Sequence, residues 1–420
     1  MVNLRASGIG VLVVLVASAL GSVTAQAAVT GHGSRTPASR PAVGTIRPPI
    51  RYAAVAAPAR PDKPGHGAKS TSVVYPPTTI QTAYDFGSYA SSGGSGQTIA
   101  VVDAYGDPTL TSDLATFDKK FGLTSTTVNV STPDGAPTAT NSSWAIETAL
   151  DVEWAHANAP NATIDLVEAP DSSFQHLLDA VAYAISLKPA AVSMSWGAAE
   201  SDYSASSCVV PGGIGPETCL AAYEAVFEGA NTTTALFASS GDQGAYDGTH
   251  PKTVTVNYPA SSPEVIAVGG TTLNVTSAGA WSSETAWSDS GGGYSKQFSE
   301  PSYQSGAGIL DPSGRRGVPD VAFDANPSTG VYVYQGGTWY SVGGTSVGSP
   351  NWAAVAADAA SSTGAAAVNL SGLYGLYKTA YSSDFHDIIT GSNGYYSAGP
   401  GWDAVTGIGS PEVSALIGGL

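Results

Sequence analysis

The sequence predicts an α/β protein with a mostly parallel β-sheet that is flanked by helices on both faces. Short apolar runs with many β-branched residues recur along the chain, as expected for strands that are buried on both sides. Helical patterns lie between several of these runs, and this alternation is typical of parallel strands joined by crossover helices. In such sheets, functional groups gather at the carboxyl ends of the strands.

The two kinds of pattern predict the elements in order. The apolar runs predict strands at 97–105, 162–169, 190–197, 232–242 and 264–273. The helical patterns predict helices at 112–122, 143–159, 173–187 and 220–233, and the small-residue run 351–360 predicts one more. The Gly- and Tyr-rich tail from about residue 380 predicts loops.

Three segments of different character divide the chain. Residues 1–27 combine Arg5, an apolar run and an Ala-x-Ala site, which predicts a secretory signal peptide and a secreted, extracellular protein without a membrane anchor. Residues 28–72 are basic and rich in Pro and Ala, which predicts a weakly ordered leader; a plain linker and a short pro-segment both fit this composition. Residues 73–420 are predicted to form one domain.

The charge and the cysteine content of the chain limit which classes of function are compatible with the sequence. The chain has 33 acidic against 16 basic residues and a net charge of −17, which argues against a nucleic acid partner because phosphate binding needs clustered Lys and Arg. Only 12% of residues are charged, which is compatible with work at acid pH. Cys208 and Cys219 are the only cysteines, and in an oxidising compartment they predict one local disulfide.

Ser346 is a candidate nucleophile that lacks an evident histidine base. It lies in the open stretch GGTSVGSP (343–350), directly before a predicted helix. A serine hydroxyl is a weak nucleophile until a neighbouring base takes its proton. Among the six histidines His156, near the end of a predicted helix, is the best candidate, and His176 has no evident Ser or acidic partner in the sequence. The others lie in the leader (His32 and His66), in a turn-like segment (His250) and in the carboxy-terminal loops (His386).

Glu147 and Asp151 offer a different base. At about 100° per residue they lie one helical turn apart on the same face of the predicted helix, whereas His156 points elsewhere. A solvated acidic face is the simplest interpretation. However, Trp144 and Trp154 fall on the same face, and desolvation with like charge would make the two carboxyl groups share a proton and act as a base in acid.

Asp242 is a third candidate carboxyl group. It follows an apolar strand, in the small-residue turn SSGDQGA. An oxyanion needs hydrogen-bond donors, and Asp donates only when it is protonated, which again points to low pH or a raised pKa. A turn-forming role for this Asp is the alternative.

The stretches ETALDVEW, SSGD and GGTSVGSP, in this order, resemble the sedolisin family of serine-carboxyl peptidases. The resemblance covers residues 75–420 and implies a subtilisin-like fold. It implies Ser346 as nucleophile, Glu147 as general base, Asp151 as the carboxylate that orients Glu147 and shares its proton, and Asp242 as oxyanion donor. The family is usually made with a large folded pro-domain, and the leader 28–72 is shorter than that.

Two further stretches resemble binding elements of this family. SMSWG (193–197) resembles its edge strand that pairs with the substrate, which implies Ser195, Trp196 and Gly197 as substrate-binding residues. DFHDII and AGPGWDAVTGIGSP resemble its single structural calcium site, and carboxylates with backbone carbonyls are the hard oxygen ligands that Ca²⁺ prefers. The implied ligands are Asp387, Ile388, Gly399, Gly401 and Asp403.

These observations predict a secreted, acid-active, monomeric endopeptidase that cleaves proteins or peptides. A histidine-dependent subtilisin-like protease is one alternative, with Asp103 at a strand end as its acid, but no His-Gly-Thr opens a helix after Asp103. An inactive secreted binding domain of the same fold is the other alternative. The presence of all four candidate catalytic residues argues against it.

Overall fold

The computed structural model describes residues 46, 48, 50–58, 73–203, 223–246, 253–309, 311, 313–364 and 368–420. All of them belong to one compact unit, Ala42–Leu420. The predicted signal peptide 1–27, most of the leader 28–72, and both Cys208 and Cys219 lie outside the described residues. No helix in this part of the chain is long and apolar enough to cross a membrane.

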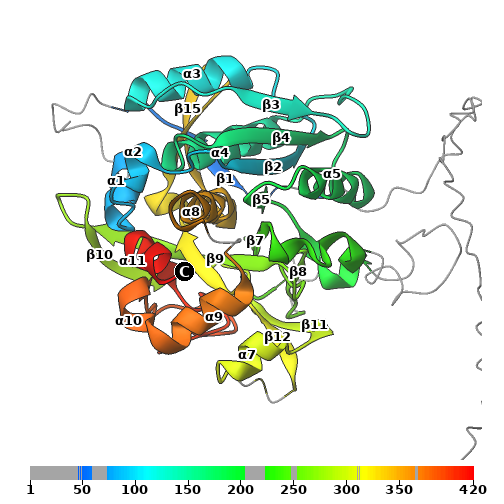
Figure 1. Cartoon of the computed structure of the whole chain (residues 1–420), viewed down its shortest axis with the longest axis vertical. Helices are drawn as coiled ribbons and strands as arrows, with labels where there is room; N and C mark the ends of the chain where they lie inside the picture. Colours follow the sequence, from blue (N-terminus) through cyan, green and yellow to red (C-terminus); the bar gives the residue numbers. More distant parts are fainter. Residues whose placement is uncertain are drawn as a thin grey trace, which may run out of the picture. The chain divides into compact units, whose positions relative to one another are not determined.

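A mostly parallel, eight-stranded sheet forms the centre of the domain (Figure 1), as the sequence predicts. Its strand order is β10-β9-β7-β5-β2-β4-β3, and β13 also pairs with β9. All of these pairs are parallel except β9 with β10. The strands are β2 (Thr98–Ala104), β3 (Val128–Ser131), β4 (Thr163–Ala169), β5 (Ala191–Met194), β7 (Ala235–Ser239), β9 (Ile266–Val275), β10 (Trp281–Ala286) and β13 (Val321–Asp324).

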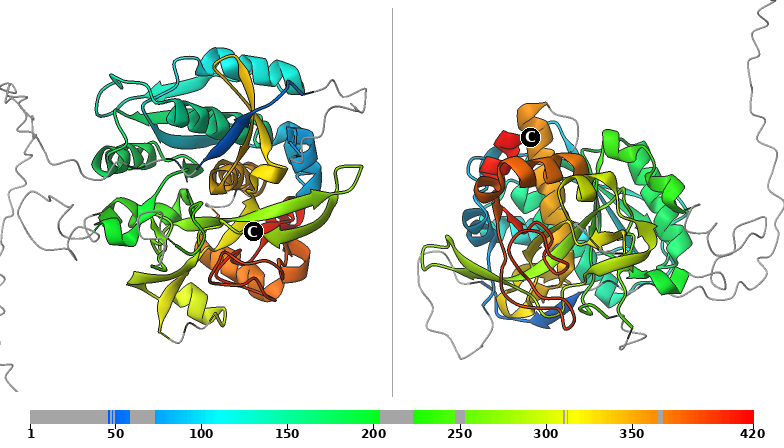
Figure 2. Two further views of the ribbon diagram at one scale, coloured as in Figure 1. Left: turned by 180° about the vertical axis from the view of Figure 1, so that it is seen from behind. Right: turned by 90° about the horizontal axis from the view of Figure 1, so that it is seen from below.

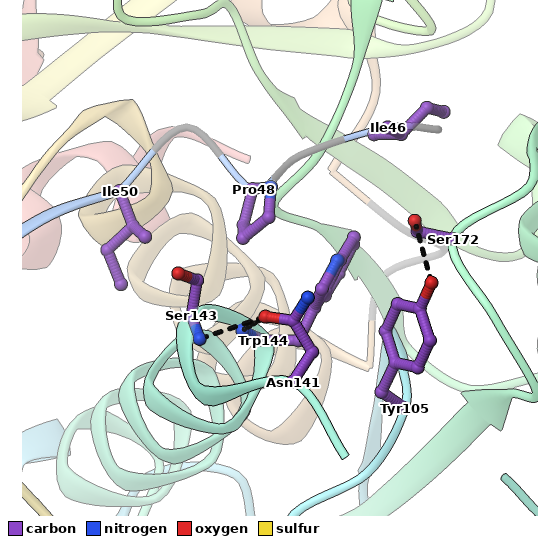
Figure 3. Close-up of a pocket in the computed structure, with 8 residues that line it drawn as sticks. All are labelled: Ile46, Pro48, Ile50, Tyr105, Asn141, Ser143, Trp144 and Ser172. Atoms are coloured by element: carbon purple, nitrogen blue, oxygen red, sulfur yellow. Dashed lines mark hydrogen bonds between the residues drawn. The ribbon is translucent and has the colours of Figure 1, made fainter. Parts of the chain in front are cut away.

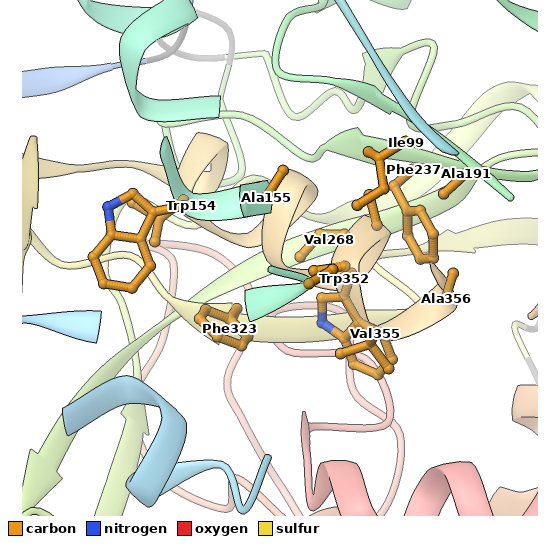
Figure 4. Packing of buried hydrophobic residues seen from close by; sticks show 14 of the residues in the cluster. Ile99, Trp154, Ala155, Ala191, Phe237, Val268, Phe323, Trp352, Val355 and Ala356 are labelled. Atoms are coloured by element: carbon orange, nitrogen blue, oxygen red, sulfur yellow. The ribbon is translucent and has the colours of Figure 1, made fainter. Parts of the chain in front are cut away.

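Helices cover both faces of this sheet because the strands carry apolar side chains in both directions. On β2, Ile99 and Val101 belong to the core that contains α4 and α8, whereas Ala100 and Val102 belong to the core that contains α5. The ring of Trp352 on α8 stacks on Phe237 of β7 at 6.3 Å between centroids (Figure 4). The long helices are α3 (Leu110–Phe121), α4 (Ser142–Asn158), α5 (Phe174–Ser186) and α8 (Gly348–Thr363).

Helix α4 is buried on every side. The Asn141 side chain caps its first turn by accepting hydrogen bonds from the backbone N–H groups of Ser143 and Trp144 at 3.0 and 3.3 Å. Every residue from Trp144 to Asn158 is buried, because α4 lies between the sheet, α3, α8 and β14. The acidic residues of this helix therefore do not form a solvated face.

The carboxy-terminal part is more regular than the sequence predicts. The tail from residue 380 was expected to be loops, and this expectation is wrong for α11 (Val413–Gly419), where Val413, Leu416 and Ile417 are buried at helical spacing. Shorter elements surround the core. They are α1 (Pro77–Ala83), α2 (Tyr89–Ser92), α7 (Ser302–Gly306), α9 (Leu370–Thr379), α10 (Tyr381–Asp384), β6 (Ala198–Ala199), β8 (Asn257–Tyr258), β11 (Gly293–Ser299), β12 (Arg315–Val318), β16 (Phe385–His386) and β17 (Ser410–Pro411).

Part of the leader forms a strand on the domain. Residues Arg51–Ala54 (β1) pair antiparallel with β15 (Thr338–Gly343), which forms a hairpin with β14 (Val331–Gln335). Figure 2 shows β1 beside this hairpin. The backbone N–H of Ile46 also donates to the carbonyl of Ser172 at 3.0 Å. Residues 46, 48 and 50–58 are therefore part of the fold.

Candidate active site

The residues of the candidate site come from five elements that meet at one edge of the sheet. Asp103 lies near the carboxyl end of β2, Ser195 follows β5 and Asp242 follows β7. These neighbouring strands are parallel, so their carboxyl ends lie at the same edge. Helix α4 supplies Glu147, and the short 3₁₀ helix η4 (Thr345–Val347), which leads into α8, supplies Ser346.

Glu147 and Asp151 are fully buried side by side on α4. Burial raises the pKa of Glu147 well above its usual value, and the charges of Asp151 and Asp103 add to this. The nearby Ser346 hydroxyl acts in the opposite direction by favouring the ionised carboxylate, although neither carboxyl oxygen of Glu147 has a hydrogen-bond partner among the described residues. The structure thus places the candidate base near the candidate nucleophile.

Asp151 is held by hydroxyl groups behind Glu147. Its pKa is also raised well above the usual value by burial and by the charge of Asp103. The Ser195 hydroxyl donates to Asp151 Oδ1 at 2.8 Å, and it also lies 3.4 Å from the backbone carbonyl of Ser346. This serine ties the carboxylate, the strand end and the nucleophile loop together.

Asp103 is a third buried carboxyl group that the sequence did not assign to this cluster. Burial raises its pKa to about 7, with a contribution from Glu168, while the nearby Thr148 hydroxyl opposes the shift. Asp103 in turn raises the pKa values of both Glu147 and Asp151. The only sequence signal for this role was an Asp near the end of a buried strand.

The substrate-binding stretch around Ser195 is arranged differently from the expectation. β5 is a central strand between β2 and β7 rather than an edge strand, and it ends at Met194. Trp196 is buried and its indole N–H donates to the carbonyl of Val102 at 2.8 Å. At Gly197 an added Cβ would lie 2.9 Å from the carbonyl of Tyr258, so the chain requires glycine there. These contacts fix the conformation of residues 195–197.

Asp242 is oriented by the residue before the nucleophile. Its Oδ1 accepts hydrogen bonds from the backbone N–H and the hydroxyl of Thr345 at 2.8 and 2.9 Å. Its Oδ2 has no hydrogen-bond partner within the described residues, although it is buried. Burial and the charge of Asp289 raise the Asp242 pKa to about 7, against the opposing effects of Thr345 and Arg51. Below that pH, Oδ2 carries a proton that it can donate.

None of the described histidines replaces Glu147. His156 bonds to the carbonyl of Thr124 at 2.8 Å and lies 3.4 Å from Asp118, as expected for a ring that points away from Glu147. His176 has an acidic partner that the sequence analysis missed, Asp171, at 2.8 Å. His386 stacks on Trp281 and pairs with Glu412 at 3.1 Å. His32, His66 and His250 lie outside the described residues.

The residues predicted to bind calcium lie together at the carboxy-terminal end. The backbone N–H of Gly401 donates to Asp387 Oδ1 at 3.1 Å, and that of Gly399 donates to Asp403 Oδ2 at 3.1 Å. No hydrogen bond within the described residues uses the carbonyls of Ile388, Gly399 or Gly401. No group of three or more His, Cys, Asp or Glu side chains in this part of the chain is placed to hold a metal. A cation here would therefore need those carbonyls, which fit Ca²⁺.

The leader covers a pocket beside the amino-terminal end of α4. Ile46, Pro48 and Ile50 line one side of this space of about 480 Å³. The other side is formed by Tyr105, Asn141, Ser143, Trp144 and Ser172 (Figure 3). Glu147, the candidate base, lies one helical turn beyond this lining on the same helix.

Replacing Asp103 tests the buried carboxyl cluster. Because its pKa is about 7 when folded and near 3.8 when unfolded, the free energy of unfolding should fall as pH rises through that interval. Asp103→Asn removes this titration. Between pH 3.5 and 7.5, the free energy of unfolding of the variant should therefore rise by more than about 1.4 kcal/mol relative to that of its parent. Urea unfolding on a Ser346→Ala background measures this, with the exposed Glu228→Gln as control. Equal pH slopes in variant and parent would contradict the prediction.

Comparisons with known proteins agree with this geometry. Residues 136–373 match the model of the subtilase family. Kumamolisin from Bacillus sp. (strain MN-32) is 36% identical over 370 residues, which cover 82% of this chain and 63% of that protein. Sedolisin from Pseudomonas sp. (strain 101) is 41% identical over 204 residues, which cover 42% of this chain and 33% of that protein. The chain thus spans less than two-thirds of the length of both relatives.

A solved structure gives the same result in three dimensions. Pseudomonas sedolisin, described as a serine-carboxyl proteinase complexed with two molecules of pseudo-iodotyrostatin, superposes with a TM-score of 0.73 at 32% identity. The match covers 83% of this chain and 98% of that one. A lanthipeptide protease shares the fold at 14% identity and a TM-score of 0.52. This chain is therefore a member of the sedolisin family of serine peptidases, built on the subtilase fold.

Proposed function

We propose that the protein is a secreted, acid-active serine-carboxyl endopeptidase that hydrolyses peptide bonds through an acyl-enzyme on Ser346. The observation that carries the proposal is the proximity of the Ser346 hydroxyl to a buried Glu147, backed by Asp151, with each described histidine paired elsewhere. A buried carboxylate is a competent base when its pKa approaches the working pH.

In the first half of the reaction, the Ser346 hydroxyl attacks the carbonyl carbon of the scissile bond and its proton passes to Glu147. The oxygen of the tetrahedral intermediate accepts a hydrogen bond from protonated Asp242, whose Oδ2 is buried and unpartnered within the described residues. The C–N bond then breaks as Glu147 returns the proton to the leaving amine. An ester on Ser346 remains.

In the second half, a water molecule attacks this ester and Glu147 accepts its proton. The acid product leaves when Ser346 regains a proton from Glu147. Asp151 accepts a hydrogen bond from Ser195 and so stays oriented behind Glu147 throughout. Three neighbouring buried carboxyl groups repel one another when ionised, so the cluster retains a shared proton that moves between Glu147 and Asp151.

The stretch Ser195–Gly197 is proposed to hold the substrate backbone. The Ser195 and Trp196 side chains are already engaged, with Asp151 and with the carbonyl of Val102. Their main-chain groups, which follow the carboxyl end of β5, are therefore the groups proposed to pair with substrate.

The leader 28–72 is proposed to be a pro-segment rather than a linker. Its described residues 46, 48 and 50–58 lie along the domain, where Ile46 bonds to Ser172 and Arg51 pairs with Gly343. A segment in this position would keep substrate out until it leaves. A signal peptide at 1–27, extracellular localisation, a monomeric state and a Cys208–Cys219 disulfide complete the proposal.

Calcium is proposed to bind at the carboxy-terminal loops. Asp387 and Asp403 would hold it with the backbone carbonyls of Ile388, Gly399 and Gly401. When bound, the ion would supply positive charge that offsets two neighbouring carboxylates and joins two segments of the chain.

The first prediction of the proposed function concerns the nucleophile and the base. Ser346→Ala should abolish cleavage of a denatured protein, and Glu147→Gln should lower kcat/KM by about 10²–10⁴-fold because it removes the proton acceptor. Glu153→Gln is the matched control, since this carboxyl group is also buried on α4 but accepts from the backbone of Tyr334. Cleavage that survives Ser346→Ala would show that the protein is not a serine peptidase.

The second prediction concerns Asp242 and pH. Because Asp242 donates only when protonated, kcat/KM should fall as pH rises through about 7. In Asp242→Asn the amide donates at every pH, so this alkaline decline should disappear. Asp242→Ala has no hydrogen-bond donor at this position, so its kcat/KM should be about 10²–10³-fold lower at all pH values. An unchanged alkaline limb in Asp242→Asn would assign that limb to another group.

The third prediction concerns calcium. Removing Ca²⁺ with EGTA from protein saturated with it should lower the melting temperature, and added Ca²⁺ should restore it, because an ion that binds only the folded state stabilises that state. The stabilisation is about 2.7 kcal/mol when the ion is at a hundred times its Kd. Asp387→Asn should weaken the response and Glu228→Gln should keep it. The same response in Asp387→Asn and in the parent would place the ion elsewhere.

A further inference from the structure

The side chain of Arg51 is held at a site of three parts beside Asp242. Its guanidinium lies 2.8 Å from Asp289 Oδ2 and donates to the backbone carbonyl of Asp242 at 3.1 Å. It also lies over the ring of Trp287, 6.0 Å from its centroid. A carboxylate, a carbonyl and an aromatic face are together suited to a planar cation with several N–H donors.

The path of the leader shows which part of a bound chain reaches this site. Going from the amino to the carboxyl end, the leader first bonds to Ser172, then passes the amino-terminal end of α4, and then reaches Arg51. There it pairs with Gly343, which lies just before the nucleophile loop. In Figure 3 Ile46, Pro48 and Ile50 follow this direction above α4.

A substrate on the same path would place residues that follow its scissile bond along β15. β15 already pairs with β14 on one side, so the leader occupies its other edge. Once the leader leaves, that edge presents backbone groups that a substrate strand can use. The site around Asp289 would then face a substrate side chain on the leaving-group side of the cleaved bond.

We propose that Asp289 and Trp287, with the backbone carbonyl of Asp242, form a subsite that selects arginine on the leaving-group side of the substrate, and that Arg51 occupies this subsite in the full chain. The proposal rests on the proposed peptidase function. The Asp289 carboxylate lies at this position, so acidic substrate side chains are disfavoured there.

The expected selectivity is modest because the ion pair is partly exposed. The side chains of Arg51 and Asp289 are 48% and 37% exposed, so solvent screens their attraction. An exposed pair of this kind contributes at most about a fivefold preference. The contact with the Trp287 ring and the hydrogen bond to the Asp242 carbonyl favour arginine over lysine, because the ammonium group of lysine is not planar.

The test maps cleavage sites in a mixture of peptides of diverse sequence by mass spectrometry. With the unchanged chain, incubated in acid until it is active, arginine should be enriched about fivefold at one of the first three positions after the cleaved bond. This enrichment should vanish in Asp289→Asn and should turn into a preference for acidic residues in Asp289→Lys. It should persist in Glu228→Gln and Glu228→Lys, which make the same charge changes at an exposed residue of another element.

A second measurement needs no catalysis. In full-length Ser346→Ala protein, hydrogen exchange of the amides in 50–58 reports leader docking. Asp289→Asn and Arg51→Ala should each speed this exchange severalfold, and Glu228→Gln should not.

The outcomes separate the subsite from the peptidase function. Cleavage without arginine enrichment, or with enrichment that Asp289→Asn leaves intact, overturns the subsite and keeps the peptidase. No cleavage in any mixture, while exchange still depends on Asp289, overturns the peptidase function and with it the substrate preference. If neither Asp289→Asn nor Arg51→Ala changes the rate of hydrogen exchange in 50–58, the cation site itself is overturned.

Discussion

The burial of several carboxyl groups in one region is the constraint on which the site depends. Asp103, Glu147 and Asp151 are fully buried, and the groups that shift their pKa values are other carboxyl groups and hydroxyls. Each ionisation there makes the next one harder, so protons remain on the cluster at a pH where exposed carboxylates have lost them. The acid-base chemistry proposed for low pH rests on this arrangement.

The fold supplies that burial through α4. This helix has no solvent-facing side, since α3, α8, β14 and the sheet surround it, and so any acid placed on it is desolvated. The neighbouring carboxyl end of β7 provides Asp242 in a different state. Hydrogen bonds from Thr345 fix one of its oxygens and leave the other for a reacting group. One scaffold thus offers both the proposed base and the proposed proton donor from the same chemical group.

The leader contacts the same parts of the domain that a substrate is proposed to contact. It lies over the amino-terminal end of α4, adds a strand to β15 and places Arg51 next to Asp242. A positive charge at that position favours the ionised form of Asp242, which cannot donate a hydrogen bond. Docking of the leader and protonation of the oxyanion donor therefore oppose each other through the charge of Arg51.

Local patterns in the sequence determined much of the fold. Apolar runs of strand length gave β2, β4, β5, β7 and β9, because strands buried on both faces leave a continuous apolar signal that needs no knowledge of their neighbours. The pair Glu147 and Asp151 was visible for a similar reason, since helical spacing alone puts both on one face. Ser346 stood out because of the glycines around it.

Long-range contacts decided what those patterns left open. The sequence could not show that α4 is buried on all sides, which turns an acidic pair from a solvated face into a proton-sharing cluster. It could not add Asp103 to that cluster, nor place Arg51 beside Asp242, because these residues meet only when distant segments pack together. Residue spacing fixes which side chains share a face, whereas burial, which sets the pKa values, depends on everything that packs against that face.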